Sequence, residues 1–180
     1  TGRLVDLATG TVAATFDNFI SPTGPGGQAV NLNGVGGTLT VLGATSITTP
    51  GGQGINIAGS AVAARFGTST TITDPTTQGI LVGTSTGNVS FGNATISDAT
   101  DAISLQNNSA GTRSFGAITV TNGSGDSFLH GVGGGTTTGA PAVSGAPAAS
   151  SAHVEPEQVT VGDIAAVTVD GVATTGYARI

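Results

Sequence analysis

The sequence has no cysteine, methionine, tryptophan or lysine, and only 8% of its 180 residues are charged. Its four basic residues are all arginine, and the formal net charge is −6. Binding to nucleic acid or to an anionic membrane surface needs clustered Lys and Arg, so this composition argues against both partners. The absence of cysteine rules out disulfides, but it does not by itself indicate a compartment.

Long apolar runs are also missing, because none reaches the roughly 18 residues needed to cross a bilayer. We therefore expect no membrane insertion by this segment. No N-terminal signal pattern is present, and Thr1 is not a natural start, so we expect a processed or excised piece of a longer protein. The 37% apolar content is nevertheless enough to support a core.

What the sequence does contain is a repeat of about 25 residues. A short apolar–polar–apolar segment recurs at spacings of 25, 25, 25 and 23 residues, and Phe128-Leu129 follows 25 residues after the last full copy. The copies are Val5-Asp6-Leu7, Val30-Asn31-Leu32, Ile55-Asn56-Ile57, Ile80-Leu81-Val82 and Ile103-Ser104-Leu105. A period of this length is typical of a solenoid, in which each repeat forms one coil of a stack.

Two further columns share this period. The phenylalanine column is Phe16, Val41, Phe66, Phe91 and Phe115, and the isoleucine column is Ile47, Ile72, Ile96 and Val120. Apolar and polar residues alternate around these positions, which indicates strands, and no helical period extends over ten residues. The sequence therefore predicts an all-β, right-handed parallel β-helix with equivalent residues ~4.8 Å apart. In this register Phe91→Asp would collapse the stack, whereas Asn56→Asp would be nearly silent.

The pattern predicts three parts. Residues 1–130 form the β-helix coils, 131–158 are a Gly/Ala/Pro/Ser-rich insertion or linker, and 159–180 return in register as the final coil or coils. This arrangement gives roughly six to seven coils with a long loop insertion in a late coil. The alternative is that the segment after Glu157 forms a separate strand element.

The repeats Gly54-Ile55-Asn56-Ile57, Gly79-Ile80-Leu81-Val82 and Ala102-Ile103-Ser104-Leu105 resemble the right-handed parallel β-helix stalks of autotransporter passengers and filamentous-haemagglutinin-like adhesins. The resemblance covers Val5 to about Leu129. It implies a bacterial cell-surface or extracellular location and a structural or adhesive role, although such a stalk does not specify a ligand.

Hydroxyl side chains flank the isoleucine column on four coils. This threonine face consists of Thr48, Thr71, Thr73, Thr95, Thr119 and Thr121, completed by Ser46 and Ser97. A lattice of methyl and hydroxyl groups at ~4.8 by ~7 Å could order surface water, as on the ice-binding face of some antifreeze proteins. The alternative is that Thr is simply a good outward strand residue.

Aspartates gather near one expected corner, in the set Asp74, Asp98, Asp101 and Asp126, and Gln28, Gln53 and Gln78 precede Asp101 in its column. Ca²⁺ favours such oxygen-rich turns, so these four are weak calcium candidates. The alternative is that they are solvated turn residues bonded to local backbone donors. We expect no other metal and no cofactor.

An enzymatic role has little support in the sequence. A polysaccharide-degrading β-helix needs two carboxylates at about 5–9.5 Å across a sugar, and we place Arg65 and Arg113 on a different face from the aspartates. We therefore expect a non-enzymatic extracellular structural or adhesive module. Both ends of the expected stack are open, so its partners would be further coils of the same protein or copies in a homopolymer, and a surface glycan or host ligand would contact Gly131–Glu157. Ice binding and polysaccharide binding or degradation remain the alternatives.

Overall fold

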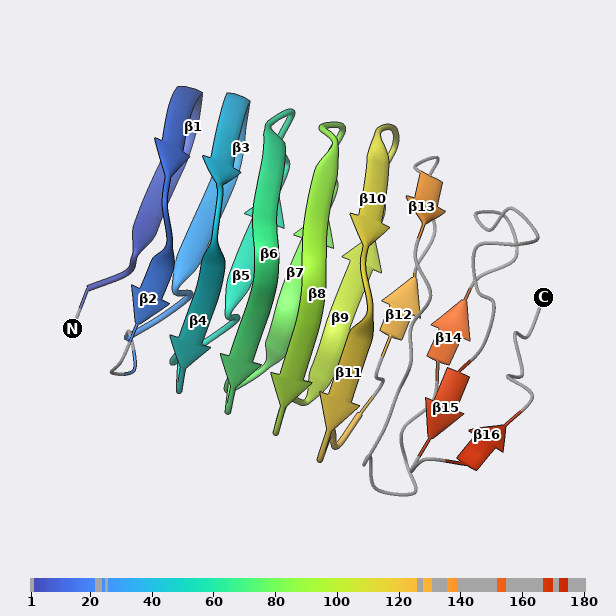
Figure 1. Ribbon diagram of the computed structural model, residues 1–180. Helices are drawn as coiled ribbons and strands as arrows, with labels where there is room; N and C mark the ends of the chain where they lie inside the picture. Colours follow the sequence, from blue (N-terminus) through green and yellow to red (C-terminus); the bar gives the residue numbers. More distant parts are fainter. Residues whose placement is uncertain are drawn as a thin grey trace.

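The computed structural model describes residues 2–21, 24 and 26–125, together with the backbone of short strands at 128–130, 136–138, 152–154, 167–169 and 172–174. All regular elements in these residues are strands, and none of the described residues forms a helix able to cross a membrane. Residues 5–121 form a parallel β-solenoid of about five coils, in which successive strands stand side by side along one axis (Figure 1). This confirms the predicted all-β solenoid.

Three walls make up each coil. The first wall contains the leading halves of β1 (Val5–Phe16) and β3 (Val30–Val41), followed by β5 (Ile55–Ala58), β7 (Gln78–Gly83) and β9 (Asp101–Gln106). The second wall contains the trailing halves of β1 and β3, the leading halves of β6 (Ala63–Thr73) and β8 (Val89–Ser97), and β10 (Thr112–Phe115). The third wall contains β2 (Phe19–Ser21), β4 (Ala44–Thr48), the trailing halves of β6 and β8, and β11 (Ile118–Thr121).

The strands are paired in the register that the sequence predicts. Ile55 pairs with Val30 on one side and Ile80 on the other, and Ile72 pairs with Ile47 and Ile96. The inward residues of the first wall are all 0% exposed from the second coil onward: Val30, Leu32, Ile55, Ile57, Ile80, Val82, Ile103 and Leu105. Each such side chain contributes on the order of 1.5–3 kcal/mol through its burial, so these columns hold the stack together.

The phenylalanine column is internal in all coils but the first. Phe66 and Phe91 stack with ring centroids 4.9 Å apart, and Phe91 and Phe115 with centroids 5.1 Å apart. The expectation that Phe16 is internal is only partly right, because this ring is 38% exposed. Phe16 lies in the first coil, where a neighbouring coil covers it from one side only. The repeat did not identify Phe19, which packs against two rings of this column. Its ring centroid lies 4.9 Å from that of Phe16 and 6.4 Å from that of Phe66.

Two corners of each coil use the left-handed backbone region. One corner has positive φ at Thr9, Gly34, Gly59, Thr84 and Asn107. The other has positive φ at Thr49, Asp74, Asp98 and Asn122. Among residues with a Cβ, Asn and Asp tolerate this region best, which explains why they recur at corners.

The described residues beyond 125 form five short strands. β12 (Phe128–His130) pairs in parallel with β9 and β14 (Ala152–Val154), and β13 (Thr136–Thr138) pairs in parallel with β10. β15 (Val167–Val169) and β16 (Val172–Thr174) pair with each other in antiparallel orientation. The other residues of 131–158 and 159–180 lie outside the described part of the chain, so the proposed boundaries of these two segments stay predictions.

Gly54 begins the recurring first-wall segment because the core leaves no room for a side chain there. A Cβ at this position would lie 2.7 Å from both the Gly79 carbonyl oxygen and Ile72 Cγ2. Gly79 meets the same obstruction one coil later, at 2.7 Å from the Ala102 carbonyl oxygen and Ile96 Cγ2. These glycines allow the first wall to approach the isoleucine column closely.

We predict that Gly54→Ala destabilises the solenoid by about 1–3 kcal/mol, the usual cost of overpacking a core. Gly83→Ala is the matched control, because a Cβ there would have its nearest neighbour, the Gln106 carbonyl oxygen, at 3.8 Å. The free energies of unfolding should be measured by urea denaturation. Equal losses in the two variants would contradict the close packing of Gly54 on Ile72.

Candidate functional site

The threonine face lies on the outer surface of the third wall. Thr71 pairs with Thr95, and Thr95 pairs with Thr119, so the first hydroxyl column is continuous from β6 to β11. The second column runs in parallel through Thr48, Thr73, Ser97 and Thr121. Thr71 and Thr95 are exposed and the other four threonines are half-buried. The structure therefore brings all six predicted threonines together on one regular surface.

The hydroxyl groups of this face are without partners in the part of the chain that the structure describes. None of its six threonine side chains makes a hydrogen bond within the described residues. Where the first hydroxyl column reaches β2, Ile20 stands opposite Ser46 and is 52% exposed. The surface is thus a lattice of hydroxyl and methyl groups whose hydroxyls do not bond to one another.

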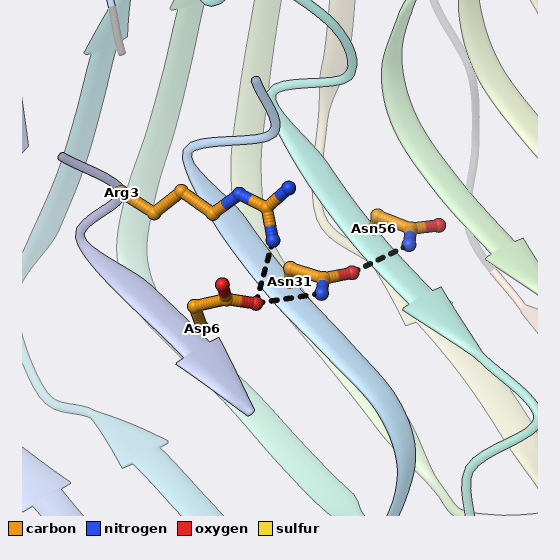
Figure 2. A network of polar contacts seen from close by, with 4 residues as sticks. All are labelled: Arg3, Asp6, Asn31 and Asn56. Atoms are coloured by element: carbon orange, nitrogen blue, oxygen red, sulfur yellow. Dashed lines mark hydrogen bonds and ion pairs between the residues drawn. The ribbon is translucent and has the colours of Figure 1, made fainter. Parts of the chain in front are cut away.

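The outer surface of the first wall behaves differently, because its polar side chains bond to one another along the stack (Figure 2). Asn56 Nδ2 donates to Asn31 Oδ1 at 2.8 Å, and Asn31 Nδ2 donates to Asp6 Oδ1 at 2.8 Å. Arg3 Nη1 donates to the same Asp6 oxygen at 2.6 Å. We call these four residues the asparagine ladder.

This ladder corrects the expectation for Asn56. The side chain does lie outside the core, but it is only 9% exposed and its amide is one step of the ladder. An aspartate at this position would have no proton to donate to Asn31 near neutral pH. The sequence did contain a sign of this ladder. Asp6, Asn31 and Asn56 form one column, in which each amide lies one coil from its acceptor.

Asp6 is the acceptor at the end of the ladder. The hydrogen bond from Asn31, and then that from Arg3, lower the pKa of the Asp6 carboxyl below its ordinary value of 3.8. Because the folded-state pKa is the lower one, the stabilisation from Asp6 is present above the unfolded-state pKa and is lost as pH falls through the folded-state value.

A second ladder accounts for the predicted aspartate Asp101. Gln53 Nε2 donates to Gln78 Oε1 at 3.2 Å, and Gln78 Nε2 donates to Asp101 Oδ2 at 3.3 Å. The amides of this glutamine ladder point toward later coils, whereas those of the asparagine ladder point toward the first coil. Each ladder ends on a carboxylate, which can only accept hydrogen bonds when ionised.

Two of the other calcium candidates, Asp74 and Asp98, lie at a corner of the coils. Asp74 and Asp98 are exposed and have φ of 54° and 59°, and their backbone N–H groups donate to the Ser97 and Thr121 carbonyls. Asp126 lies outside the described residues. Within the described part of the chain, no three His, Cys, Asp or Glu side chains gather in a group that could hold a metal ion. The positive φ supplies a conformational reason for Asp at this corner.

A buried polar column that sequence reasoning missed lines the corner after the first wall, directly following the positive-φ residues Gly59, Thr84 and Asn107. Ser60 Oγ accepts from Val35 N–H at 3.1 Å, Ser85 Oγ accepts from Ser60 N–H, and Asn108 Oδ1 accepts from Ser85 N–H at 3.0 Å. These three side chains are at most 3% exposed. They satisfy backbone donors where the chain leaves the first wall, because an unpaired buried N–H costs about 1–3 kcal/mol. The column is therefore structural.

The two arginines near the phenylalanine column point in opposite directions. Arg65 is exposed, but Arg113 is 1% exposed and occupies the interior column of Leu39, Ala64 and Val89. Both arginines belong to the second wall, but only Arg65 lies on its outer surface. The alternation of side chains along a strand indicates this difference. Arg113 lies two positions before the buried Phe115 and is therefore on the same side of its strand, whereas Arg65 lies one position before Phe66 and is on the opposite side.

Arg113 is held by backbone carbonyls. Its Nη2 donates to the Ser85 carbonyl at 2.6 Å, and its Nη1 donates to the Gly111 carbonyl at 3.0 Å and to the Ala110 carbonyl. Burial lowers the pKa of the guanidinium. Because these partners are carbonyls rather than carboxylates, Arg113 acts as a donor to the corner and not as part of a charged site.

Comparisons of the sequence with protein-family models, with curated proteins and with solved structures found no match.

We predict that Asn56→Asp destabilises the protein by about 1–3 kcal/mol at pH 7, because the change removes a donor and places a carboxylate beside Asn31 Oδ1. Asn33→Asp, on the same wall but exposed, is the control and should change stability little. The difference between the two variants should shrink at acid pH, where the new carboxyl group of Asn56→Asp is protonated and can again donate. Equal stability at pH 7 in a denaturant titration would show that the ladder contributes nothing.

Proposed function

We propose that this chain is a non-enzymatic structural or adhesive module of an extracellular bacterial surface or secreted fibre. The observation that carries the proposal is the stacking of similar coils from Val5 to Thr121, with the same column positions repeated in each. Such a stack is extended and rigid along its axis, as a stalk must be. The resemblance to the stalks of autotransporter passengers and filamentous-haemagglutinin-like adhesins supports the same role.

The placement of the carboxylates supports a non-enzymatic role. Asp6 and Asp101 accept hydrogen bonds within ladders, and Asp74 and Asp98 occupy turn positions with positive φ. A glycosidase instead holds two carboxylates at about 5–9.5 Å on either side of a sugar, with one pKa raised. At Asp6 the hydrogen bonds from Asn31 and Arg3 lower the carboxyl pKa rather than raise it.

The extracellular location is supported by composition. Only 8% of the residues are charged and none is lysine, and the polar residues are mostly Thr, Ser, Asn and Gly. This gives a weakly charged surface on a stack whose ends can associate with further coils. The proposed contact with a glycan or host ligand falls on Gly131–Glu157, which lies largely outside the described residues.

Two experiments on the purified full chain test the proposal. Negative-stain imaging tests the stalk, and an assay for new reducing ends on acidic polysaccharides tests the non-enzymatic role. We expect rigid rods that lengthen by end-to-end association as concentration rises, and no turnover. Reproducible cleavage of a polysaccharide that is lost on boiling would contradict the non-enzymatic role. Compact, non-elongated particles would contradict the stalk.

Ice binding is a second candidate, favoured by one observation. The hydroxyls of the threonine face are in register over four coils and have no internal hydrogen-bond partners in the described residues, in contrast to the amides of the first wall. A surface of this kind can order water at a repeat of ~4.8 by ~7 Å.

Thermal hysteresis of the purified protein tests the second candidate. If the threonine face binds ice, Thr95→Arg at its centre should abolish hysteresis, because the long charged side chain interrupts the lattice. Asn33→Arg on the first wall is the control and should leave hysteresis unchanged. A wild-type protein without hysteresis at high concentration removes ice binding.

A further inference from the structure

The corner between the first and second walls is one residue longer in the fifth coil than in the three coils before it. The corner is flanked by two inward residues, one from each wall, and in the second, third and fourth coils these lie seven positions apart. The flanking pairs are Leu32 and Leu39, Ile57 and Ala64, and Val82 and Val89. In the fifth coil the corresponding residues, Leu105 and Arg113, lie eight positions apart.

The extra residue lies between Asn108 and Thr112, because both of these residues keep their places beside the fourth coil. Asn108 Oδ1 accepts from Ser85 N–H at 3.0 Å, and Thr112 N–H donates to Asn88 Oδ1 at 2.9 Å. The segment between these anchors is Thr86-Gly87 in the fourth coil and Ser109-Ala110-Gly111 in the fifth coil.

The shorter corners are joined to the preceding coil by a backbone hydrogen bond. Ala61 N–H donates to the Val35 carbonyl at 2.9 Å, and Thr86 N–H donates to the Ser60 carbonyl at 2.9 Å. The next carbonyl in this column is that of Ser85, and no backbone N–H among the described residues donates to it. The longer corner therefore lacks the coil-to-coil bond that the shorter corners make.

Arg113 donates to this carbonyl in place of the backbone. Its Nη2 lies 2.6 Å from the Ser85 carbonyl oxygen, and its Nη1 donates to the carbonyls of Ala110 and Gly111 in the longer segment. One guanidinium thus links the corner of the fifth coil to the fourth coil. Burying a charged group is costly unless it is hydrogen-bonded, so these bonds account for an arginine that is only 1% exposed in a column otherwise made of apolar residues.

We propose that Arg113 replaces the backbone hydrogen bond that the corner of the fifth coil loses through its extra residue. The corner can then change in length while the inward columns on both sides stay in register, as the pairing of Val82 with Leu105 and of Val89 with Arg113 shows. The inference does not depend on the proposed function, because it concerns contacts within one chain.

The test compares Arg113→Val in two versions of the full chain, the natural one and one that lacks Ala110. The substitution copies Val89, the residue at the same position of the fourth coil. The deletion leaves Ser109 and Gly111 as the segment between the anchors, in the pattern of Thr86-Gly87. The shortened corner should allow Ser109 N–H to donate to the carbonyl of the preceding coil, as Thr86 N–H does.

In the natural chain, Arg113→Val should lower the equilibrium constant for folding by about tenfold or more, because it leaves the buried Ser85 carbonyl without a donor. In the chain that lacks Ala110, the same substitution should cause no loss, because the backbone supplies the donor. Both constants should be measured by urea denaturation. Arg65→Val, at an exposed arginine of the same wall, is the matched control and should have little effect in either chain. Equal losses from Arg113→Val in the two chains, or no loss in the natural chain, would overturn the proposal.

Hydrogen exchange of single amides supplies a second test that does not depend on the stability of a variant. In the natural chain the Thr86 amide should exchange slowly, whereas the Ser109 amide should exchange fast, because it has no partner among the described residues. Deletion of Ala110 should slow exchange at Ser109. A Ser109 amide that is already as protected as Thr86 in the natural chain would show that the backbone bond is not lost, and the role proposed for Arg113 would be wrong.

Discussion

The structure depends on the in-register stacking of equivalent residues one coil apart. Parallel pairing places each side chain directly beside its counterparts in the coils before and after, so a column works only if its members suit one another. Apolar columns satisfy this condition by burial, as Ile55 does between Val30 and Ile80. The same condition explains Gly54 and Gly79, because the isoleucine column occupies the space that a side chain would need.

Polar columns meet the condition in two ways. Amides both donate and accept, so they can link coil to coil, and each chain of amides ends at a carboxylate, Asp6 in one ladder and Asp101 in the other. The hydroxyls of the threonine face do not link to one another and have no hydrogen-bond partner within the described residues. The molecule thus has one outer surface whose hydrogen-bonding groups engage each other and another whose groups face solvent. The second surface is the better place for an external contact.

Departures from the repeat occur where the stack is irregular or ends. Phe19 sits outside the columns and supplies an aromatic ring beside Val41. Arg113 replaces an apolar residue and donates to carbonyls at a corner of the stack. In the first coil, the inward positions that are fully buried elsewhere are partly exposed. The repeat specifies the interior of a solenoid, but the apolar residues of a terminal coil need a further covering element.

The sequence by itself determined the period, the three strands of each coil and the identity of the inward columns, because burial requires alternation and stacking requires repetition. The position of Arg113, two residues before Phe115, also indicated an inward side chain. This indication is weaker than the general rule that arginine is exposed. Only the tertiary structure decided that Asn56 is bonded, that Phe19 enters the core and that the hydroxyls of the threonine face have no partners among the described residues. These properties depend on distances between side chains from different coils, and on φ angles at corners, which no pattern of residue types specifies.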